Sequence, residues 1–269
     1  MKRIGVVGVG AIGSAIMKLF PEAIGFDIAL CKETFLPRMK YIQHLPGEIS
    51  GLDIIFLCVP TPHIPGDGLD MSEIYNVAQT IAKGQANEKR RPVVVSCSTL
   101  QPGTADDLVR RYNLRLVVQP EYFGESVSHP LVDLRTTPFM ILGGESEDVE
   151  EVISLYQTVY NANTKIRRVT RLEAEVIKLS ENRAIAFKVL QCQELYDACQ
   201  AHGVDYNTVR EAVYGDDPRF NLWWTFVYSE NRGLNSKCLP KDLYGWFHWY
   251  PGPLTECLLN YNRRLRSGS

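Results

Sequence analysis

A glycine-rich run near the amino terminus has the spacing of a phosphate-binding loop. Gly8-Val9-Gly10-Ala11-Ile12-Gly13 reads G-x-G-x-x-G and directly follows an apolar run that begins at Arg3. In this motif the first glycine makes a tight turn, the second lets the backbone approach a pyrophosphate, and the third packs a helix against a strand. Asp27 ends the next apolar run, where a carboxylate binds ribose hydroxyls and repels a 2′-phosphate. The spacing predicts NAD, bound through Gly8, Gly10, Ala11, Ile12, Gly13 and Asp27.

Two later segments each follow an apolar run and carry hydroxyl groups. They are Cys58-Val59-Pro60-Thr61-Pro62 and Ser98-Thr99-Leu100-Gln101-Pro102-Gly103-Thr104. The carboxyl ends of parallel strands meet at one edge of a sheet, beside the cofactor crevice. We therefore expect Val59, Pro60, Thr61, Ser98 and Thr99 near the cofactor. The alternative interpretation is that proline and glycine merely end the two strands.

Three further places hold groups that could act on a substrate. The segment 119–125 contains Glu121 and Glu125, two carboxylates that could act in general acid–base catalysis. Lys178 and Asn182 are spaced i to i+4, so they share a helix face and could hold a substrate oxygen and stabilise an alkoxide. Cys238, with lysines on either side, could be a nucleophile. Each place also has a structural interpretation without catalysis. The two glutamates could simply lie on the surface, the lysine and asparagine could belong to a solvated helix face, and the cysteine could be a small buried apolar residue.

The elements that position these groups alternate between short β-branched runs and amphipathic helical patterns as far as about residue 170. This rhythm predicts a Rossmann-like, doubly wound parallel sheet, an NAD-binding domain over residues 1–170. One helix is signalled by Asp70 and Glu73 at its start and by Gly84 at its end. The expected strands are Arg3 to Gly8, Ile24 to Ile28, Asp53 to Val59, Pro92 to Cys97, Arg115 to Val118, Phe139 to Leu142 and Lys165 to Val169.

The pattern changes beyond residue 170. Neither glycine nor proline occurs between Gly144 and Gly203, and apolar residues fall at helical spacing from Leu172 to His202. We therefore predict an all-helical domain over residues 171–269, built on one long central helix through which a homodimer forms. The aromatic runs 223–226 and 246–250 are expected in its core or in a dimer interface, and the alternative is that they line a pocket.

Composition limits the remaining functions. The chain has 269 residues, is 45% hydrophobic and carries a formal charge of −2, so neither a nucleic acid nor a membrane is expected as its partner. We expect a cytosolic protein, because the chain contains no apolar run of membrane-spanning length. Its seven cysteines lack C-x-x-C spacing, which indicates neither a disulfide framework nor a zinc site, and no metal is expected.

Taken together and in this order, these motifs resemble the UDP-glucose/GDP-mannose dehydrogenase family from Met1 to about Asn262. Cys238-Leu239-Pro240-Lys241-Asp242 matches the family's cysteine, lysine and aspartate signature, and Lys178 and Asn182 match its central helix. Its remaining segments correspond to Ser98, Thr99, Pro120, Glu121 and Glu125.

The resemblance implies an NAD-dependent dehydrogenase that oxidises the primary alcohol of a sugar or nucleotide sugar to the carboxylate in two hydride transfers. Lys178 would stabilise the alkoxide-like oxygen, while Asn182 and Asp242 would position the water or proton acceptor. Cys238 would capture the aldehyde as a thiohemiacetal that is oxidised to a thioester. The resemblance also assigns hydrolysis of the thioester to Glu121 with Thr99 and Glu125, and it places Glu125 and Lys241 beside the cofactor.

Two departures from the family pattern concern the substrate. Asn235-Ser236 stands where the family has a glycine pair, and Leu234 stands where it has a phenylalanine. Because glycines permit close backbone approach, we expect a reshaped or narrowed substrate pocket. The family's second nucleotide-binding domain would begin near Asn262, where this sequence ends, so we expect that domain to be missing or to be supplied by a partner chain. Two alternatives remain open: a single-step dehydrogenase of the hydroxyacid type, and a catalytically silent NAD-binding partner or sensor module.

Overall fold

The computed structural model describes residues 2–30, 37–65, 67–86, 90–122, 131, 133–160 and 163–267. It separates into two compact units. The first unit comprises Met1–Pro62 and Asp70–Lys178, and the second comprises His63–Leu69 and Leu179–Ser269. Within the described residues, no helix combines the length and the apolar character that a membrane-spanning segment needs.

The first unit is built on one eight-stranded sheet with the order β3-β2-β1-β4-β5-β6-β7-β8. Neighbouring strands are parallel except β6 and β7, which are antiparallel and pair only at Val118 and Gly143. The Rossmann-like fold and all seven expected strands are confirmed, and β3 is an additional strand at the edge. The strands are β1 (Ile4–Val7), β2 (Ile24–Asp27), β3 (Met39–Tyr41), β4 (Ile54–Leu57), β5 (Val93–Ser96), β6 (Arg115–Val118), β7 (Phe139–Gly143) and β8 (Lys165–Val169).

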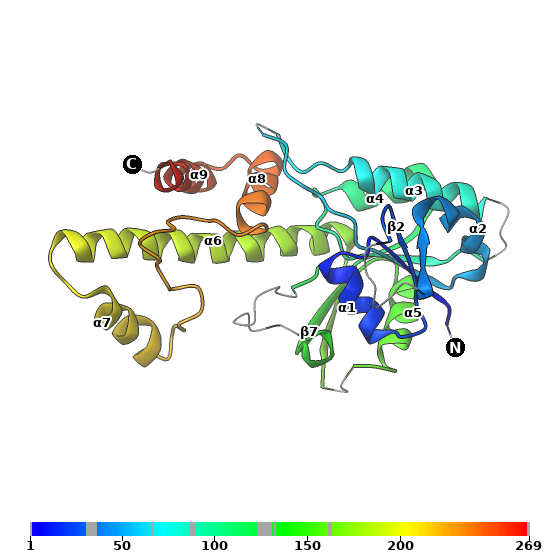
Figure 1. Ribbon diagram of the computed structural model, residues 1–269, viewed down its shortest axis with the longest axis horizontal. Helices are drawn as coiled ribbons and strands as arrows, with labels where there is room; N and C mark the ends of the chain where they lie inside the picture. Colours follow the sequence, from blue (N-terminus) through cyan, green and yellow to red (C-terminus); the bar gives the residue numbers. More distant parts are fainter. Residues whose placement is uncertain are drawn as a thin grey trace. The chain divides into compact units, whose positions relative to one another are not determined.

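Helices cover both faces of this sheet (Figure 1). In β4, Ile54 and Phe56 face the core under α1 (Ala11–Leu19) and α5 (Ser146–Tyr156), whereas Ile55 and Leu57 face the opposite core. A strand that is buried on both faces reads as a continuous apolar run. The opposite core is closed by α2 (Leu45–Glu48), α3 (Ser72–Gln85) and α4 (Thr104–Tyr112). Short 3-10 turns occur at Ile42–His44, Ile49–Gly51 and Leu134–Thr136.

The predicted end of α3 at Gly84 is wrong, because the helix continues to Gln85. A Cβ on Gly84 would come within 2.4 Å of Ile49 Cδ1 and 2.9 Å of the Pro46 carbonyl oxygen. Gly84 therefore permits close packing of α3 against the segment that contains α2, and does not end the helix.

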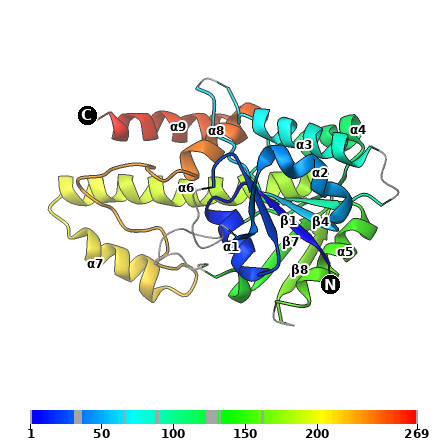
Figure 2. The same ribbon diagram turned by 45° about the vertical axis from the view of Figure 1, so that its right-hand side comes forward.

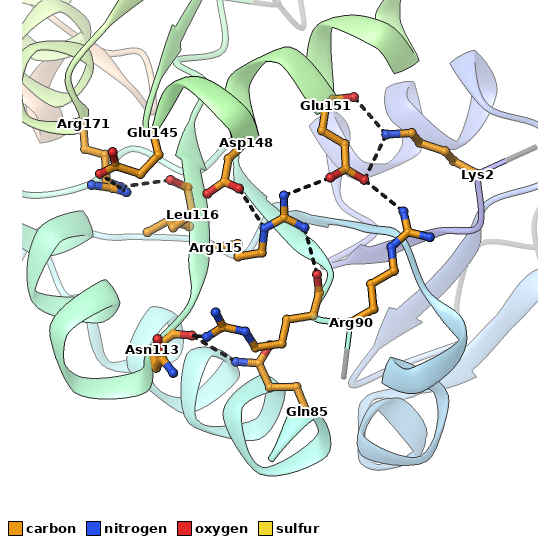
Figure 3. A network of polar contacts seen from close by, with 11 residues as sticks. Lys2, Gln85, Arg90, Asn113, Arg115, Leu116, Glu145, Asp148, Glu151 and Arg171 are labelled. Atoms are coloured by element: carbon orange, nitrogen blue, oxygen red, sulfur yellow. Dashed lines mark hydrogen bonds and ion pairs between the residues drawn. The ribbon is translucent and has the colours of Figure 1, made fainter. Parts of the chain in front are cut away.

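Charged side chains join α5 to the amino-terminal edge of the sheet (Figure 3). Arg115, the first residue of β6, donates to Asp148 at 2.8 Å and to Glu151 at 2.9 Å, and Lys2 pairs with Glu151 at 3.0 Å. Burial opposes ionisation of Glu151, but hydrogen bonds from Lys2 and Arg115 outweigh it and hold the pKa of Glu151 below its usual range. This network stabilises the side of the sheet where the strands begin. The predicted site residues lie on the opposite side, where the strands end.

The second unit is helical, and its core includes Ala186, Leu190 and Leu243. The predicted long helix is confirmed: α6 runs over Arg171–Ala201, beginning in the first unit and continuing into the second (Figure 2). The segment 63–69 packs within the second unit, where the His63 ring stacks on Tyr244 at a centroid distance of 4.9 Å. The other helical segments are α7 (Tyr206–Glu211), η5 (Ala212–Asp216), α8 (Leu239–Trp249) and α9 (Pro253–Arg266).

Candidate active site

The glycine-rich loop joins β1 to α1, as its spacing predicts. Gly8 has a φ of +87°, and a Cβ on it would come within 2.7 Å of the Cys58 carbonyl oxygen. A Cβ on Gly13 would come within 2.0 Å of the Gly8 carbonyl oxygen. A Cβ on Gly10, in contrast, would meet no atom within 4 Å. The fold therefore requires the first and third glycines, while the second leaves its side of the backbone open to a ligand.

The carboxylate of Asp27 lies directly against this loop. Its Oδ2 accepts a hydrogen bond from the backbone N–H of Val9 at 2.6 Å, and its Oδ1 accepts one from Ile28 at 2.7 Å. Gly10 provides no side-chain cap at the start of α1, where Ala11 and Ile12 begin the first turn. An uncapped helix amino terminus and a nearby carboxylate suit a pyrophosphate and a ribose, respectively. These residues fit a dinucleotide such as NAD.

The two hydroxyl-bearing segments are joined at the carboxyl edge of the sheet. Ser98, which lies two residues beyond β5, donates from its Oγ to the carbonyl oxygen of Val59 at 2.7 Å. Thr61 is buried, while Pro60 is exposed. The structure therefore brings together Ser98 and the segment 59–61, which the sequence placed near a cofactor.

A small cavity lies beside this edge within the first unit. Its volume of about 10 Å³ has room for roughly one water molecule. Thr99, Glu121 and Lys178 all line it. The Lys178 ammonium donates to the Glu121 carbonyl oxygen at 2.8 Å and lies 4.9 Å from the centroid of the Tyr122 ring. Three residues predicted from distant parts of the sequence thus lie around one cavity.

Glu175 also lines this cavity, and the sequence did not single it out. Only 2% of its surface is exposed, and its carboxylate accepts hydrogen bonds from the N–H groups of Gly103 at 2.6 Å and Ala105 at 2.8 Å. Burial raises the pKa of Glu175 to about 7, although these hydrogen bonds act in the opposite direction. The available signal was its spacing of three residues from Lys178, which puts both on one helix face.

A second polar cluster surrounds Asp242 in the second unit. Asp242 is fully buried and accepts hydrogen bonds from the Asn182 amide and, at 2.5 Å, from the Lys241 ammonium. Cys238 immediately precedes α8, one turn before Asp242, and is exposed. A buried carboxylate is stable only with such partners, so the cluster fixes Asp242 near the amino end of α8.

The loop before Cys238 is held by two contacts within the second unit. Gly233 has a φ of +78°, and the next residue, Leu234, donates its N–H to Asn262 Oδ1 at 2.6 Å. The Oγ of Ser236 accepts a hydrogen bond from the N–H of Leu239 at 3.1 Å. Ser236 therefore bonds to the first turn of α8, which a glycine could not do.

The predicted site residues thus form two groups. Thr99, Glu121 and Lys178 lie together in the first unit, and Asn182, Lys241 and Asp242 lie together in the second. Cys238 precedes Lys241 by three residues. Glu125 lies outside the described residues. Across the part of the chain that the structure describes, no group of three or more His, Cys, Asp or Glu side chains is arranged to hold a metal ion.

Family models match most of the chain. Residues 29–162 match the NAD binding domain of the UDP-glucose/GDP-mannose dehydrogenase family, and residues 172–250 match its central domain. The glycine-rich loop and Asp27 precede the first matched range. Both matched domains occur in the order that the sequence predicts.

Curated relatives are similar over a large part of this chain. UDP-glucose 6-dehydrogenase of Rhizobium meliloti is 28% identical over 81% of the chain and 50% of the relative. GDP-mannose 6-dehydrogenase of Pseudomonas aeruginosa is 25% identical over 90% of the chain and 62% of the relative. The chain therefore spans about half to two thirds of the length of these relatives.

Solved structures show the same fold. A UDP-glucose dehydrogenase from Pyrobaculum islandicum superimposes with a TM-score of 0.82 at 22% identity, covering 98% of this chain and 68% of the other. A GDP-mannose dehydrogenase from Pseudomonas aeruginosa gives a TM-score of 0.71 at 22% identity, covering 98% and 69%. Both similarities extend through the two units.

Proposed function

Because the chain belongs to the UDP-glucose/GDP-mannose dehydrogenase family, we propose that it is an NAD-dependent dehydrogenase that oxidises a sugar or nucleotide-sugar primary alcohol to the carboxylate. The observation that carries this proposal is the buried cluster of Asp242, Asn182 and Lys241 at the start of α8, with the exposed Cys238 thiol one turn before Asp242. A catalytically silent module would have no evident use for this arrangement.

The first unit supplies the proposed cofactor site. The open side of Gly10, the uncapped start of α1 and the Asp27 carboxylate are suited to hold NAD. When bound, NAD supplies a hydride acceptor, once for each of the two oxidation steps. Val59, Thr61 and Ser98 would line the same crevice at the carboxyl edge of the sheet.

In the first oxidation, side chains of this protein would stabilise the negative charge that develops on the substrate hydroxyl oxygen and position the acceptor of its proton. The Lys178 ammonium would bind that oxygen and stabilise its developing negative charge. Asn182 and Asp242 would hold the water that receives the proton. The product of this step is an aldehyde.

In the second oxidation, Cys238 would act as a nucleophile. Its sulfur forms a bond to the aldehyde carbon, its proton moves to the carbonyl oxygen, and a thiohemiacetal results. Loss of one hydride and one proton converts that adduct to a thioester. Glu121, with Thr99 and Glu125, would then accept a proton from water as it attacks the thioester carbon. The carbon–sulfur bond breaks, releasing the carboxylate and the Cys238 thiol.

The substrate class is part of this proposal. The relatives named above act, by their names, on UDP-glucose or GDP-mannose, and each is longer than this chain. The exposed side chains of Asn235 and Ser236 stand in the loop before Cys238, where glycines would permit closer backbone approach. UDP-glucose is therefore the first substrate to test, followed by GDP-mannose and unactivated hexoses.

The test measures NADH formed per molecule of UDP-glucose consumed, with purified protein and excess NAD. The expected ratio is two, because the thioester route oxidises the alcohol and then the aldehyde. A ratio of one would instead favour a single-step dehydrogenase. NAD binding without NADH formation on any of the tested alcohols would contradict an enzymatic role.

The role of Cys238 is tested by Cys238→Ser. This variant should stop after the first step or accumulate an adduct, whereas Cys257→Ser, which changes another exposed cysteine in the same unit, should behave like the wild type. Unchanged NADH yield from Cys238→Ser would overturn the thioester mechanism.

A homodimer through α6 is also part of the proposal. Phe187, on α6, is 40% exposed in the single chain, and Trp223 and Phe226, outside α6, are 48% and 59% exposed. Aromatic side chains of this kind are enriched in interfaces. Light scattering should give twice the mass of the chain. A concentration-independent monomer would contradict the dimer.

A further inference from the structure

Glu175 caps a helix that lies far from it in sequence. Gly103, the N-cap of α4, has a φ of +94° and offers no side chain to bond the first-turn N–H groups. Glu175 supplies the missing acceptor from α6: Oε2 bonds Gly103 N, 72 residues away, and Oε1 bonds Ala105 N, 70 residues away. Both carboxylate oxygens are therefore used to hold the start of α4.

The loop that ends in this cap also carries Thr99. Thr99 and Lys178 line the same water-sized cavity as Glu175, and Lys178 follows Glu175 by three residues on α6. A carboxylate on the helix that carries Lys178 is thus bonded directly to the loop that carries Thr99. All of these residues belong to the first unit.

We propose that Glu175 is a positioning residue, which anchors the loop 98–104 to α6 and so fixes Thr99 with respect to Lys178. The catalytic consequence rests on the proposed function; the anchoring itself does not. The buried position of Glu175 supports the assignment, because a carboxylate with 2% exposure loses nearly all its hydration and is kept at such a place only with strong partners.

Two substitutions distinguish the contribution of the Glu175 hydrogen bonds from that of its side-chain shape. Glu175→Gln keeps the shape but replaces one acceptor oxygen with an amide that faces an N–H group, so one of the two bonds is lost. Glu175→Ala removes both bonds. Glu194→Gln, an exposed position on the same helix, is the matched control.

Hydrogen exchange of the segment 101–108 measures the anchoring without any substrate. Protection in Glu175→Gln should fall roughly threefold to tenfold, the ratio that corresponds to one net hydrogen bond. It should fall further in Glu175→Ala, while the segment 72–85, which contains α3, stays unchanged in both. Equal protection of the segment 101–108 in wild type, Glu175→Gln and Glu194→Gln would overturn the anchoring.

Steady-state kinetics test the consequence of the anchoring. Misplacing Thr99 relative to Lys178 should lower kcat about tenfold to a hundredfold. The KM for NAD should stay near the wild-type value, because the glycine-rich loop and Asp27 are untouched. A variant with reduced protection and wild-type kcat would overturn the positioning role. A wild type that forms no NADH from any tested alcohol would contradict the proposed function, while the exchange comparison would still decide the anchoring.

Discussion

The side-chain amide of Asn182 donates a hydrogen bond to the carboxylate of Asp242, 60 residues further along the chain and fully buried. The bond joins the middle of α6 to the start of α8 within the second unit. Lys241 also donates to Asp242, so this one buried carboxylate accepts hydrogen bonds from two side chains.

Removing the Asp242 carboxylate should therefore cost stability as well as turnover. Asp242→Ala should lower the free energy of unfolding by about 1–3 kcal/mol, because it leaves the buried Asn182 amide unsatisfied. Asp216→Ala, at an exposed position in the same unit, should change it by less than about 0.5 kcal/mol. Urea denaturation measures both. Equal effects of the two substitutions would show that the buried cluster contributes nothing.

The two glycines Gly10 and Gly13 should respond differently to an added methyl group. Gly13→Ala places a Cβ 2.0 Å from the Gly8 carbonyl oxygen and should destabilise the fold by about 1–3 kcal/mol. Gly10→Ala places it in open space, so thermal stability should stay unchanged while affinity for NAD falls roughly tenfold or more. Thermal denaturation and calorimetric titration with NAD separate the two effects. Wild-type NAD affinity in Gly10→Ala would place the cofactor elsewhere.

Glu175 should make the stability of the protein depend on pH. Its pKa is raised from 4.5 to about 7 by burial, so between these values the native state holds a proton that the unfolded state has lost. Stability contributed by that proton is full below about pH 4.5 and is lost as pH rises towards 7. The melting temperature of the wild type, relative to that of Glu175→Gln, should therefore be higher at pH 5 than at pH 8. A constant difference across this range would mean that Glu175 is already ionised at pH 5.

The loop before Cys238 should accept the glycine pair that the family carries. Ser236→Gly removes the hydrogen bond to Leu239, which should cost roughly a few tenths of a kcal/mol, as for a capping serine replaced by glycine. The double variant Asn235→Gly, Ser236→Gly also frees space for close backbone approach. We expect its kcat/KM for UDP-glucose to rise about tenfold. No change in kcat/KM would show that the two side chains do not restrict the sugar site.

The sequence was informative wherever one segment carried its own signal. All seven predicted strands exist, because strands buried on both faces are continuous apolar runs, and α6 is recognisable because 31 residues lack glycine and proline. The strand β3 was missed because it has only three residues at the edge of the sheet and includes Lys40. Gly84 was misread because its role depends on Ile49 and Pro46, not on its neighbours in sequence.

The candidate site was only partly predictable for the same reason. Thr99, Glu121 and Lys178 each follow a recognisable pattern, and the structure places them around one cavity. Glu175 follows none, because its partners are backbone N–H groups 70 and 72 residues away. A backbone donor has no residue type, so no side-chain motif can mark the place where such a carboxylate binds.

The segment 63–69 affects how the protein can be divided and how it unfolds. These residues are flanked on both sides by the first unit, yet they pack in the second, where Leu69 lies against Gly245 and Asp67 pairs with His248 at 2.8 Å. A fragment that begins at residue 171 would lack them and would expose apolar surface around Gly245. The helical unit is therefore not formed by one continuous stretch of sequence, and its unfolding should be thermodynamically coupled to that of the sheet through the connections at 62–63 and 69–70 and through α6.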